Sequence, residues 1–203
     1  ATDRNYHFGS KIAFDGKGHI FFGIGDRGQH FDFPQKLDNH NGKIHRLNDD
    51  GSIPADNPFV NMPGAMASIY SYGHRNPQGT CIDPLTGEIW VSEHGPRGGD
   101  ELNLIRPGVN YGWPVISYGI NYDGTVLTSL TEKEGMEQPV FYWTPSIGPC
   151  GMTFVTGDRY PRWKHNIMLG SLPLKHLERV VMKDNTVIRA AQLLEGIGRV
   201  RNV

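Results

Sequence analysis

Three stretches of the chain share one shape: GHIFFGIG at 18–25, GEIWVSEHG at 87–95 and HNIMLGSL at 165–172. Each begins at a turn, continues as a strand of large apolar residues and ends in a loop that contains Gly. Another expected strand precedes each of them, at KIAFD (11–15), GTCID (79–83) and MTFVT (152–156). Repeated strand–turn–strand units with Gly-rich exits are typical of propeller blades of roughly 40–50 residues. The sequence therefore predicts an all-β propeller.

The remaining strand patterns agree with this architecture, and no long helix is indicated. Short alternating or apolar runs predict strands at 19–24, 43–47, 68–72, 88–92, 166–169, 177–182 and 187–191. A short turn is expected near 158–163. With a period of roughly 40–50 residues, the chain supplies about four to five blades. We expect a piece of a larger ring, because no closing strand follows the last loop; an irregular β-sandwich is the alternative fold.

Composition limits the class of protein. The chain has 203 residues, 37% hydrophobic and 20% charged, which is typical of a folded globular domain. A net charge of −1 implies no basic face, which argues against nucleic acid as a partner. No apolar run approaches the roughly 18 residues of a membrane span. The first residues show no signal-peptide pattern, so such a peptide is absent or already removed. Cys81 and Cys150 allow one disulfide or none, and two unpaired thiols are favoured.

Loops that follow the strands of a propeller converge on one face, so distant residues can build one pocket. His7 stands before the first expected strand, and an unperturbed His can accept a proton near neutral pH. A structural or exposed His is the plainer interpretation. Arg75 and Asn76 lie in a turn, where a planar guanidinium can bind a carboxylate and an amide can donate and accept. A salt bridge with an Asx turn is the alternative there.

The stretch SEHGPRGGDELNLIRPGVNYGWP (92–114) combines backbone freedom with two adjacent carboxylates. Gly95 and Pro96 can expose their carbonyls, because Gly has no side chain and Pro has no N–H. Asp100, Glu101 and the carbonyl of Tyr111 are hard oxygen ligands suited to Ca²⁺. The spacing is not that of an EF-hand, and a plain surface loop is the alternative.

Two further segments carry groups that suit an anionic or aromatic ligand. The turn YGINYDG (118–124) presents two tyrosines, of which Tyr122 is the second. Arg199 and Arg201 would face the same side of a strand, since side chains alternate along it. Two guanidinium groups so placed repel each other unless an anion lies between them. A solvated charged strand is the alternative.

Taken together and in order, these loops resemble the soluble PQQ-dependent aldose sugar dehydrogenases of the glucose/sorbosone dehydrogenase family. The resemblance runs along essentially the whole chain. It rests on HFGSK (7–11), GKIHRLNDDGSIPADNPF (42–59), YGHRNPQG (72–79), SEHGPRGGDELNLI (92–105), NYGWP (110–114), YGINYDG (118–124), EQPVFYW (137–143) and GRVRNV (198–203).

The resemblance implies a six-bladed β-propeller, with residues 1–203 as a single domain that is incomplete at both ends. It implies PQQ- and Ca²⁺-dependent oxidation of an aldose sugar at its anomeric carbon to a lactone. The hydride would pass to PQQ, and the electrons would then pass to an external acceptor. A periplasmic or secreted location is also implied. The sequence does not indicate the preferred sugar, the acceptor or the oligomeric state.

The resemblance also implies roles for particular residues. His7 is similar to the base that takes the proton of the sugar C1 hydroxyl. The carbonyls of Gly95 and Pro96 are similar to ligands of a Ca²⁺ that sits against PQQ. Asp100, Glu101 and the carbonyl of Tyr111 are similar to a separate, structural Ca²⁺ site. The residues similar to further PQQ contacts are Arg75, Asn76, Tyr122, Arg199 and Arg201.

The chain departs from the family pattern in three places. Pro173 stands where the family often has a Lys that reaches PQQ, and Lys175 could replace that Lys only if the loop shifts by two residues. A Gln on an early blade of the family has no match. Tyr6 precedes the base where some members have Asp, so the group that orients His7 is not identified. Pro173 and the missing Gln leave open a propeller that binds Ca²⁺ without PQQ-dependent turnover. A Ca²⁺-dependent sugar lactonase on a similar propeller is a third interpretation.

Overall fold

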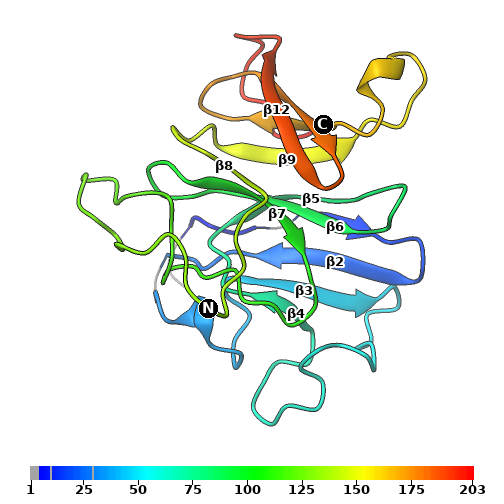
Figure 1. Ribbon diagram of the computed structural model, residues 1–203. Coiled ribbons are helices and arrows are strands. Elements are labelled where there is room, and N and C mark those ends of the chain that lie inside the picture. Colours follow the sequence, from blue (N-terminus) through cyan, green and yellow to red (C-terminus); the bar gives the residue numbers. More distant parts are fainter. Residues whose placement is uncertain (1–4, 10, 29) are drawn as a thin grey trace.

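The computed structural model describes residues 5–9, 11–28 and 30–203, and the regular secondary structure of this part of the chain is almost entirely β-strand, joined by long loops (Figure 1). Its twelve strands form three four-stranded antiparallel sheets. The first sheet contains β1 (Ile12–Phe14), β2 (His19–Ile24), β3 (Lys43–Asn48) and β4 (Ile69–Tyr72). The second contains β5 (Pro77–Ile82), β6 (Ile89–Glu93), β7 (Asp100–Ile105) and β8 (Phe141–Trp143). The third contains β9 (Pro149–Phe154), β10 (Ile167–Ser171), β11 (Leu177–Lys183) and β12 (Thr186–Leu193).

Each sheet is a meander of consecutive strands, and the sheets pack face to face in chain order (Figure 1). The first strands of the sheets come together, because β5 contacts both β1 and β9. This arrangement confirms the all-β, propeller-type fold that the sequence predicts. The described residues form three such sheets, fewer than the four to five expected. The long connections at 25–42, 49–68 and 106–140 account for the difference, because they lengthen each unit well beyond its strands.

Two strands escape the sequence analysis. β7 lies in the Gly-Pro-rich stretch that the sequence presents as a loop, yet it pairs with β6 along its full length. Its Asp100 and Asn103 are buried, so the polar residues that suggested a loop are in fact inside the fold. β8 has only three residues, too few for an alternation to be recognised. The short turn expected near 158–163 is present as the 3₁₀ turn η2 (Pro161–Trp163), and a similar turn, η1 (Phe33–Gln35), precedes β3.

The core consists of two apolar layers, one in each gap between neighbouring sheets. The larger layer joins the second and third sheets and includes the buried Trp90, Leu102 and Leu169. The smaller layer joins the first and second sheets through residues such as Ile44 and Val91. Cys81 and Cys150 are both buried and unpaired, as the sequence analysis favours. No helix in the described part of the chain is long and apolar enough to cross a membrane.

The larger layer should dominate stability. Leu169 of β10 is completely buried in it, whereas Leu85, in the turn before β6, is 75% exposed. We expect Leu169→Ala to lower the free energy of unfolding by about 2–5 kcal/mol, because it leaves a cavity between two sheets. The matched Leu85→Ala should change it by less than about 0.5 kcal/mol. Urea denaturation of the two variants measures the difference, and equal losses would contradict this view of the core.

Candidate functional site

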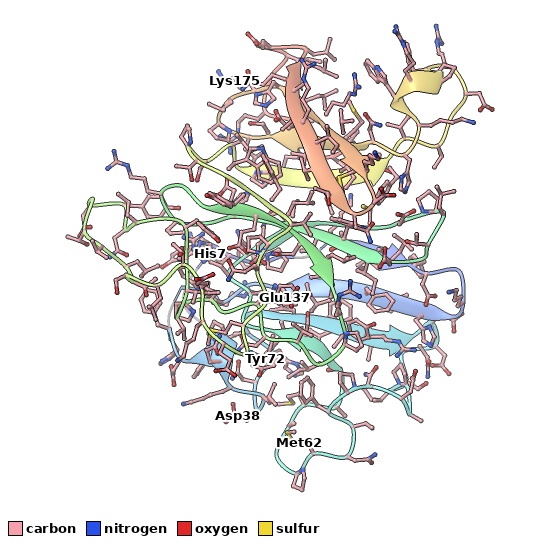
Figure 2. All side chains as sticks on the ribbon, viewed as in Figure 1. His7, Asp38, Met62, Tyr72, Glu137 and Lys175 are labelled. Atoms are coloured by element: carbon pink, nitrogen blue, oxygen red, sulfur yellow. The ribbon has the colours of Figure 1, made fainter. Side chains whose placement is uncertain are left out.

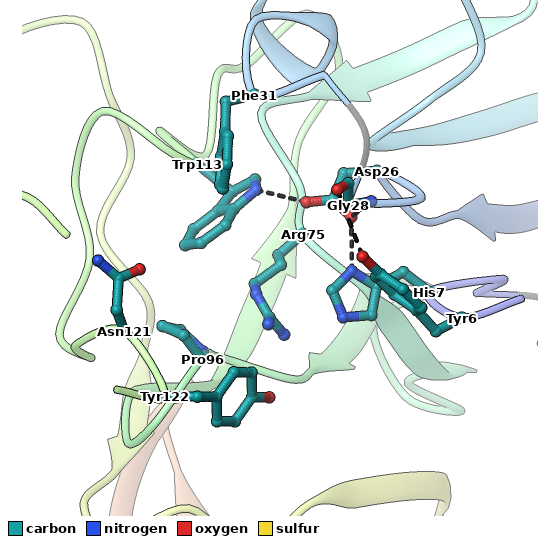
Figure 3. Close-up of a pocket in the computed structure, with 10 residues that line it drawn as sticks. All are labelled: Tyr6, His7, Asp26, Gly28, Phe31, Arg75, Pro96, Trp113, Asn121 and Tyr122. Carbon is teal, nitrogen blue, oxygen red and sulfur yellow. Dashed lines mark hydrogen bonds and ion pairs between the residues drawn. The ribbon is translucent and has the colours of Figure 1, made fainter. Parts of the chain in front are cut away.

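Loops from the first two sheets surround one cavity of about 450 Å³ (Figure 3). It lies where the segment before β1, the β2–β3 and β4–β5 connections, the β6–β7 loop and the long β7–β8 connection meet. This convergence of distant loops is what the propeller fold predicts. The lining residues are Tyr6, His7, Asp26, Gly28, Phe31, Arg75, Pro96, Trp113, Asn121 and Tyr122.

His7 is held at the cavity wall by a buried carboxylate. Its Nδ1 lies 2.6 Å from Oδ1 of Asp26, which is only 2% exposed. The same oxygen accepts the Gly28 N–H at 2.8 Å, and Oδ2 accepts the Trp113 indole N–H at 2.8 Å. Both oxygens of the carboxylate thus accept hydrogen bonds from N–H donors. His7 then donates from Nδ1, and its Nε2 is left as an acceptor toward the cavity (Figure 3).

Asp26 is therefore the orienting group that the sequence analysis could not identify. It follows β2 directly, within the Gly-rich stretch GIGDRG (23–28). An acidic residue at a strand exit, where propeller loops converge, was the available signal. Its link to His7 depends on packing between segments 19 residues apart, which the sequence does not reveal.

The backbone around His7 depends on close approach to the end of β2. His7 has a φ of +56°, a conformation that non-glycine residues rarely adopt. A Cβ on Gly25 would collide with the His7 carbonyl oxygen. Two residues later, the Gly9 N–H donates to Oδ1 of Asn76 at 3.2 Å. Gly25 and Asn76 thus fix the segment that carries His7.

Arg75 enters the cavity from the β4–β5 turn (Figure 3). It is 5% exposed, and its Nη1 donates to the carbonyls of His94 at 3.1 Å and Gly95 at 2.6 Å. Its buried Nε has no hydrogen-bond partner. Its guanidinium carbon lies 5.2 Å from the centre of the Trp113 ring. A guanidinium in a cavity wall favours a ligand that carries anionic or carbonyl oxygens.

A buried carboxylate anchors the turn that presents Arg75. Oε2 of Glu93 accepts the Arg75 N–H at 2.8 Å, and Oε1 accepts from His74 and Asn103 at 2.9 Å each. The other ring nitrogen of His74 lies 2.9 Å from the Ser71 hydroxyl. The order Ser–His–Glu resembles a hydrolytic triad, but Ser71 and His74 are completely buried. This row can hold the turn, and it offers no nucleophile to a substrate.

The adjacent carboxylates of β7 separate in the structure. Oδ1 of Asp100 accepts from the Gly95 N–H and the Ser146 hydroxyl, and Oδ2 accepts from the Ile147 and Gly148 N–H groups. These four donors occupy the acceptor positions of the carboxylate. Neighbouring residues of a strand face opposite sides, so Glu101 points elsewhere. Asp100 therefore acts as an anchor for two loops, with no acceptor position left for a metal ion.

Glu101 and Tyr111 lie in one region, linked by the Glu93 network. Asn103 donates to Oε2 of Glu101 at 3.0 Å as well as to Glu93. The ring of Tyr111 stacks on His74 with centroids 4.7 Å apart. Burial, with the nearby Glu93 carboxylate, raises the pKa of Glu101 to about 8. A cation beside Glu101 would offset this electrostatic cost.

The expected Ca²⁺ carbonyls lie at the cavity edge. Pro96 lines the cavity, and the Gly95 carbonyl beside it accepts the Arg75 guanidinium. Among the described residues, no three His, Cys, Asp or Glu side chains are placed to hold a metal ion together. A cation at Gly95 and Pro96 would therefore depend on backbone carbonyls and on the ligand itself.

The other predicted cofactor contacts lie at different distances from the cavity. Tyr122 is on its rim and 73% exposed. Asn76 is buried, and its Oδ1 accepts the Gly9 N–H. Lys175 is exposed and well separated from His7 (Figure 2).

Arg199 and Arg201 are exposed and are not among the residues that line the cavity. The Arg201 carbonyl accepts the Gly151 N–H at 3.0 Å, which holds this segment along the third sheet. Burial raises the pKa of the Cys150 thiol, and the two arginines partly oppose that rise. The pair thus lies near Cys150, beside β9.

Comparison with known proteins adds a family and several relatives. The family model described as "Glucose / Sorbosone dehydrogenase" matches residues 1–203. The chain is 42% identical over 200 residues to "Aldose sugar dehydrogenase YliI" of Escherichia coli (strain K12), covering 97% of this chain and 54% of that protein. The chain thus spans about half the length of this relative.

Solved structures agree with the sequence comparison. A crystal structure of a glucose dehydrogenase matches with a TM-score of 0.91 and 44% identity, over 95% of this chain and 56% of that one. The PQQ-bound form of aldose sugar dehydrogenase from Streptomyces coelicolor matches with a TM-score of 0.74 and 32% identity, over 95% and 51%.

The contact between Gly25 and His7 can be tested directly. We expect Gly25→Ala to push the His7 backbone away and to destabilise the fold by about 1–3 kcal/mol. A displacement of about 1 Å at His7 should lower any turnover that depends on it by about 10²-fold. Gly157→Ala is the matched control, since its Cβ would meet nothing within 4 Å and its φ is not positive. Thermal unfolding and kcat measure both effects, and identical behaviour of the two variants would refute the contact.

Proposed function

The chain belongs to the glucose/sorbosone dehydrogenase family, and on that premise we propose that the cavity around His7 and Arg75 is the active site of a PQQ- and Ca²⁺-dependent aldose sugar dehydrogenase. The reaction would oxidise an aldose at its anomeric carbon to the lactone. One observation carries the proposal: a His with an acceptor nitrogen, held by a buried Asp, shares a cavity with a buried Arg whose Nε is unpaired.

His7 is the proton acceptor in this proposal. Its Nε2 would take the proton of the C1 hydroxyl as the C1–H bond gives up its hydride, which leaves a C1=O bond in the lactone. Asp26 keeps the imidazole in the required tautomer and stabilises the imidazolium that forms. When bound, PQQ would supply the hydride acceptor, polarised by Ca²⁺.

The residues present suit such a cofactor. PQQ is a flat quinone with three carboxylates, and Arg75 provides a guanidinium at the cavity wall. Phe31, Trp113 and Tyr122 provide apolar ring surface for a flat ligand. The volume of about 450 Å³ lies within the range of small-molecule sites. A solved relative at 32% identity is described as PQQ-bound, which supports the same choice. Asn76, Lys175, Arg199 and Arg201 remain predicted contacts.

We propose two Ca²⁺ positions, both built largely from backbone oxygen. The first uses the carbonyls of Gly95 and Pro96. Nη1 of Arg75 already donates to the Gly95 oxygen at 2.6 Å, so a cation there would share this oxygen with Arg75. The second uses the Glu101 carboxylate and the Tyr111 carbonyl, where a cation would relieve the repulsion between Glu101 and Glu93.

A second candidate is a propeller that binds ligand and cation without turnover. Pro173 stands at the position of the family lysine and packs against Gly148. Lys175, the nearest replacement, is exposed and does not line the cavity. If PQQ needs the positive charge of that lysine, this protein would lose PQQ binding or turnover. A periplasmic or secreted location, an external electron acceptor and a six-bladed ring also remain predictions.

The experiment that separates these candidates is a PQQ titration of the full-length protein in the presence of Ca²⁺, followed by addition of an aldose. We expect PQQ to bind and its quinone absorption to fall when the aldose is added. Removal of Ca²⁺ with a chelator should abolish the change. Binding without any fall across a panel of aldoses would support the non-catalytic propeller, and absence of PQQ binding would overturn the proposal.

The role of His7 has its own test. We expect His7→Ala to lower kcat by about 10²-fold or more, because the substitution removes the Nε2 that would accept the proton. PQQ affinity should change little. His40→Ala serves as a control, since His40 is exposed and does not line the cavity. Turnover that survives in His7→Ala would show that another group is the base.

A further inference from the structure

Trp113 contacts Asp26, which holds His7, and also contacts Arg75, although the sequence analysis assigned it no role. We propose that Trp113 is a positioning residue, which fixes the proton acceptor through its indole N–H and the arginine through its ring face. The inference builds on the proposed function, because it assigns a part in the same reaction. It stands on contacts that exist without a bound ligand.

The first contact fixes the carboxylate that holds His7. Trp113 Nε1 donates to Oδ2 of Asp26 at 2.8 Å, while Oδ1 accepts from His7 and Gly28. With donors on both oxygens, the carboxylate plane cannot turn. Without the indole N–H, Oδ2 would be a buried acceptor with no partner, and the carboxylate could rotate to reach another donor. The direction of His7 Nε2 depends on this plane.

The second contact holds Arg75. Its guanidinium carbon lies 5.2 Å from the Trp113 ring centre, and both side chains are buried. Nη1 donates to the carbonyls of His94 and Gly95 on one side of the guanidinium, and the Trp113 ring supports the guanidinium from another side. A cation over an aromatic face is attracted to it. Between these supports, the guanidinium is held at the cavity wall, with its Nε buried and unpaired.

Trp113 is itself clamped by the neighbouring segments. The backbone N–H of Trp113 donates to the Gly73 carbonyl at 2.9 Å, and the backbone carbonyl of Trp113 accepts from the Gln35 side chain at 2.7 Å. Gly73 opens the turn that presents Arg75, and the Arg75 carbonyl accepts the Asp26 N–H at 2.8 Å. The backbone of Trp113 is thus held by Gly73 and Gln35, and its side chain contacts Asp26 and Arg75, which are themselves joined through the backbone.

The two contacts predict separable effects in the full-length protein. Trp113→Phe keeps an aromatic face and removes the N–H, so kcat should fall by about tenfold while the Kd of PQQ changes by less than about threefold. Trp113→Leu removes both the aromatic face and the N–H, so the Kd of PQQ should also rise by about threefold or more. Trp143→Phe is the matched control, because Trp143 is equally buried, its indole N–H has no partner and it lies outside the cavity lining.

A readout without turnover keeps this test independent of the proposed function. Nitrogen-15 NMR of the His7 imidazole, in protein without PQQ, should show the Nδ1–H tautomer in the native protein. Trp113→Phe should raise the Nε2–H fraction, and Trp143→Phe should leave it unchanged. Equal tautomer populations and equal kcat in both variants would overturn the inference. If the native protein has no turnover, the proposed function fails, and the tautomer measurement still decides the role of Trp113.

A second variant covers the case in which Trp113→Phe does not fold. Asp26→Asn keeps the indole in place and changes its acceptor. The indole N–H resonance of Trp113 should then move, whereas that of Trp143 should stay. An unmoved Trp113 resonance would refute the hydrogen bond on which the inference rests.

Discussion

The Asp26 carboxylate is the point on which the arrangement of the cavity depends. A buried carboxylate is stable as an anion only when hydrogen-bond donors surround it. Asp26 meets that need with donors from three separate segments: the chain before β1, the start of the β2–β3 connection and the long β7–β8 connection. Because its own N–H binds the Arg75 carbonyl, it also reaches the β4–β5 turn. Four pieces of chain are thereby held around one charge, and His7 and Arg75 are brought into one cavity.

Two further buried carboxylates beside this cavity also accept hydrogen bonds from several segments. Glu93, at the end of β6, accepts the backbone N–H of Arg75 and two side-chain donors. Asp100, at the start of β7, accepts three backbone N–H groups and the Ser146 hydroxyl. Each carboxylate replaces the hydrogen bonds that a loop leaving a sheet cannot form with a neighbouring strand. The Gly-rich loops therefore keep defined shapes, although their residues have unusual backbone freedom.

This view changes how the acidic residues of the β6–β7 stretch are understood. In the sequence, Asp100 and Glu101 look like a pair that needs a cation. In the fold, the alternation of β7 sends them to different environments, one rich in N–H donors and the other beside Glu93. Only Glu101 keeps an electrostatic cost that a cation would relieve. The strongest acidic signal in the sequence thus contains one structural anchor and one candidate ligand.

The sequence by itself determined the β-class of the fold, ten of its twelve strands, the propeller-type repeat and the positions of His7, Arg75, Pro96 and Tyr122 in one set of loops. These features follow from local patterns, because alternation, turn residues and motifs are written in consecutive positions. Only the tertiary structure decided that Asp26 and Trp113 orient His7, that Asp100 binds backbone, and that Arg199 and Arg201 lie near Cys150. Those facts depend on which donors face which acceptors across segments far apart in the chain, and a hydrogen bond of that kind leaves no periodic mark in the sequence.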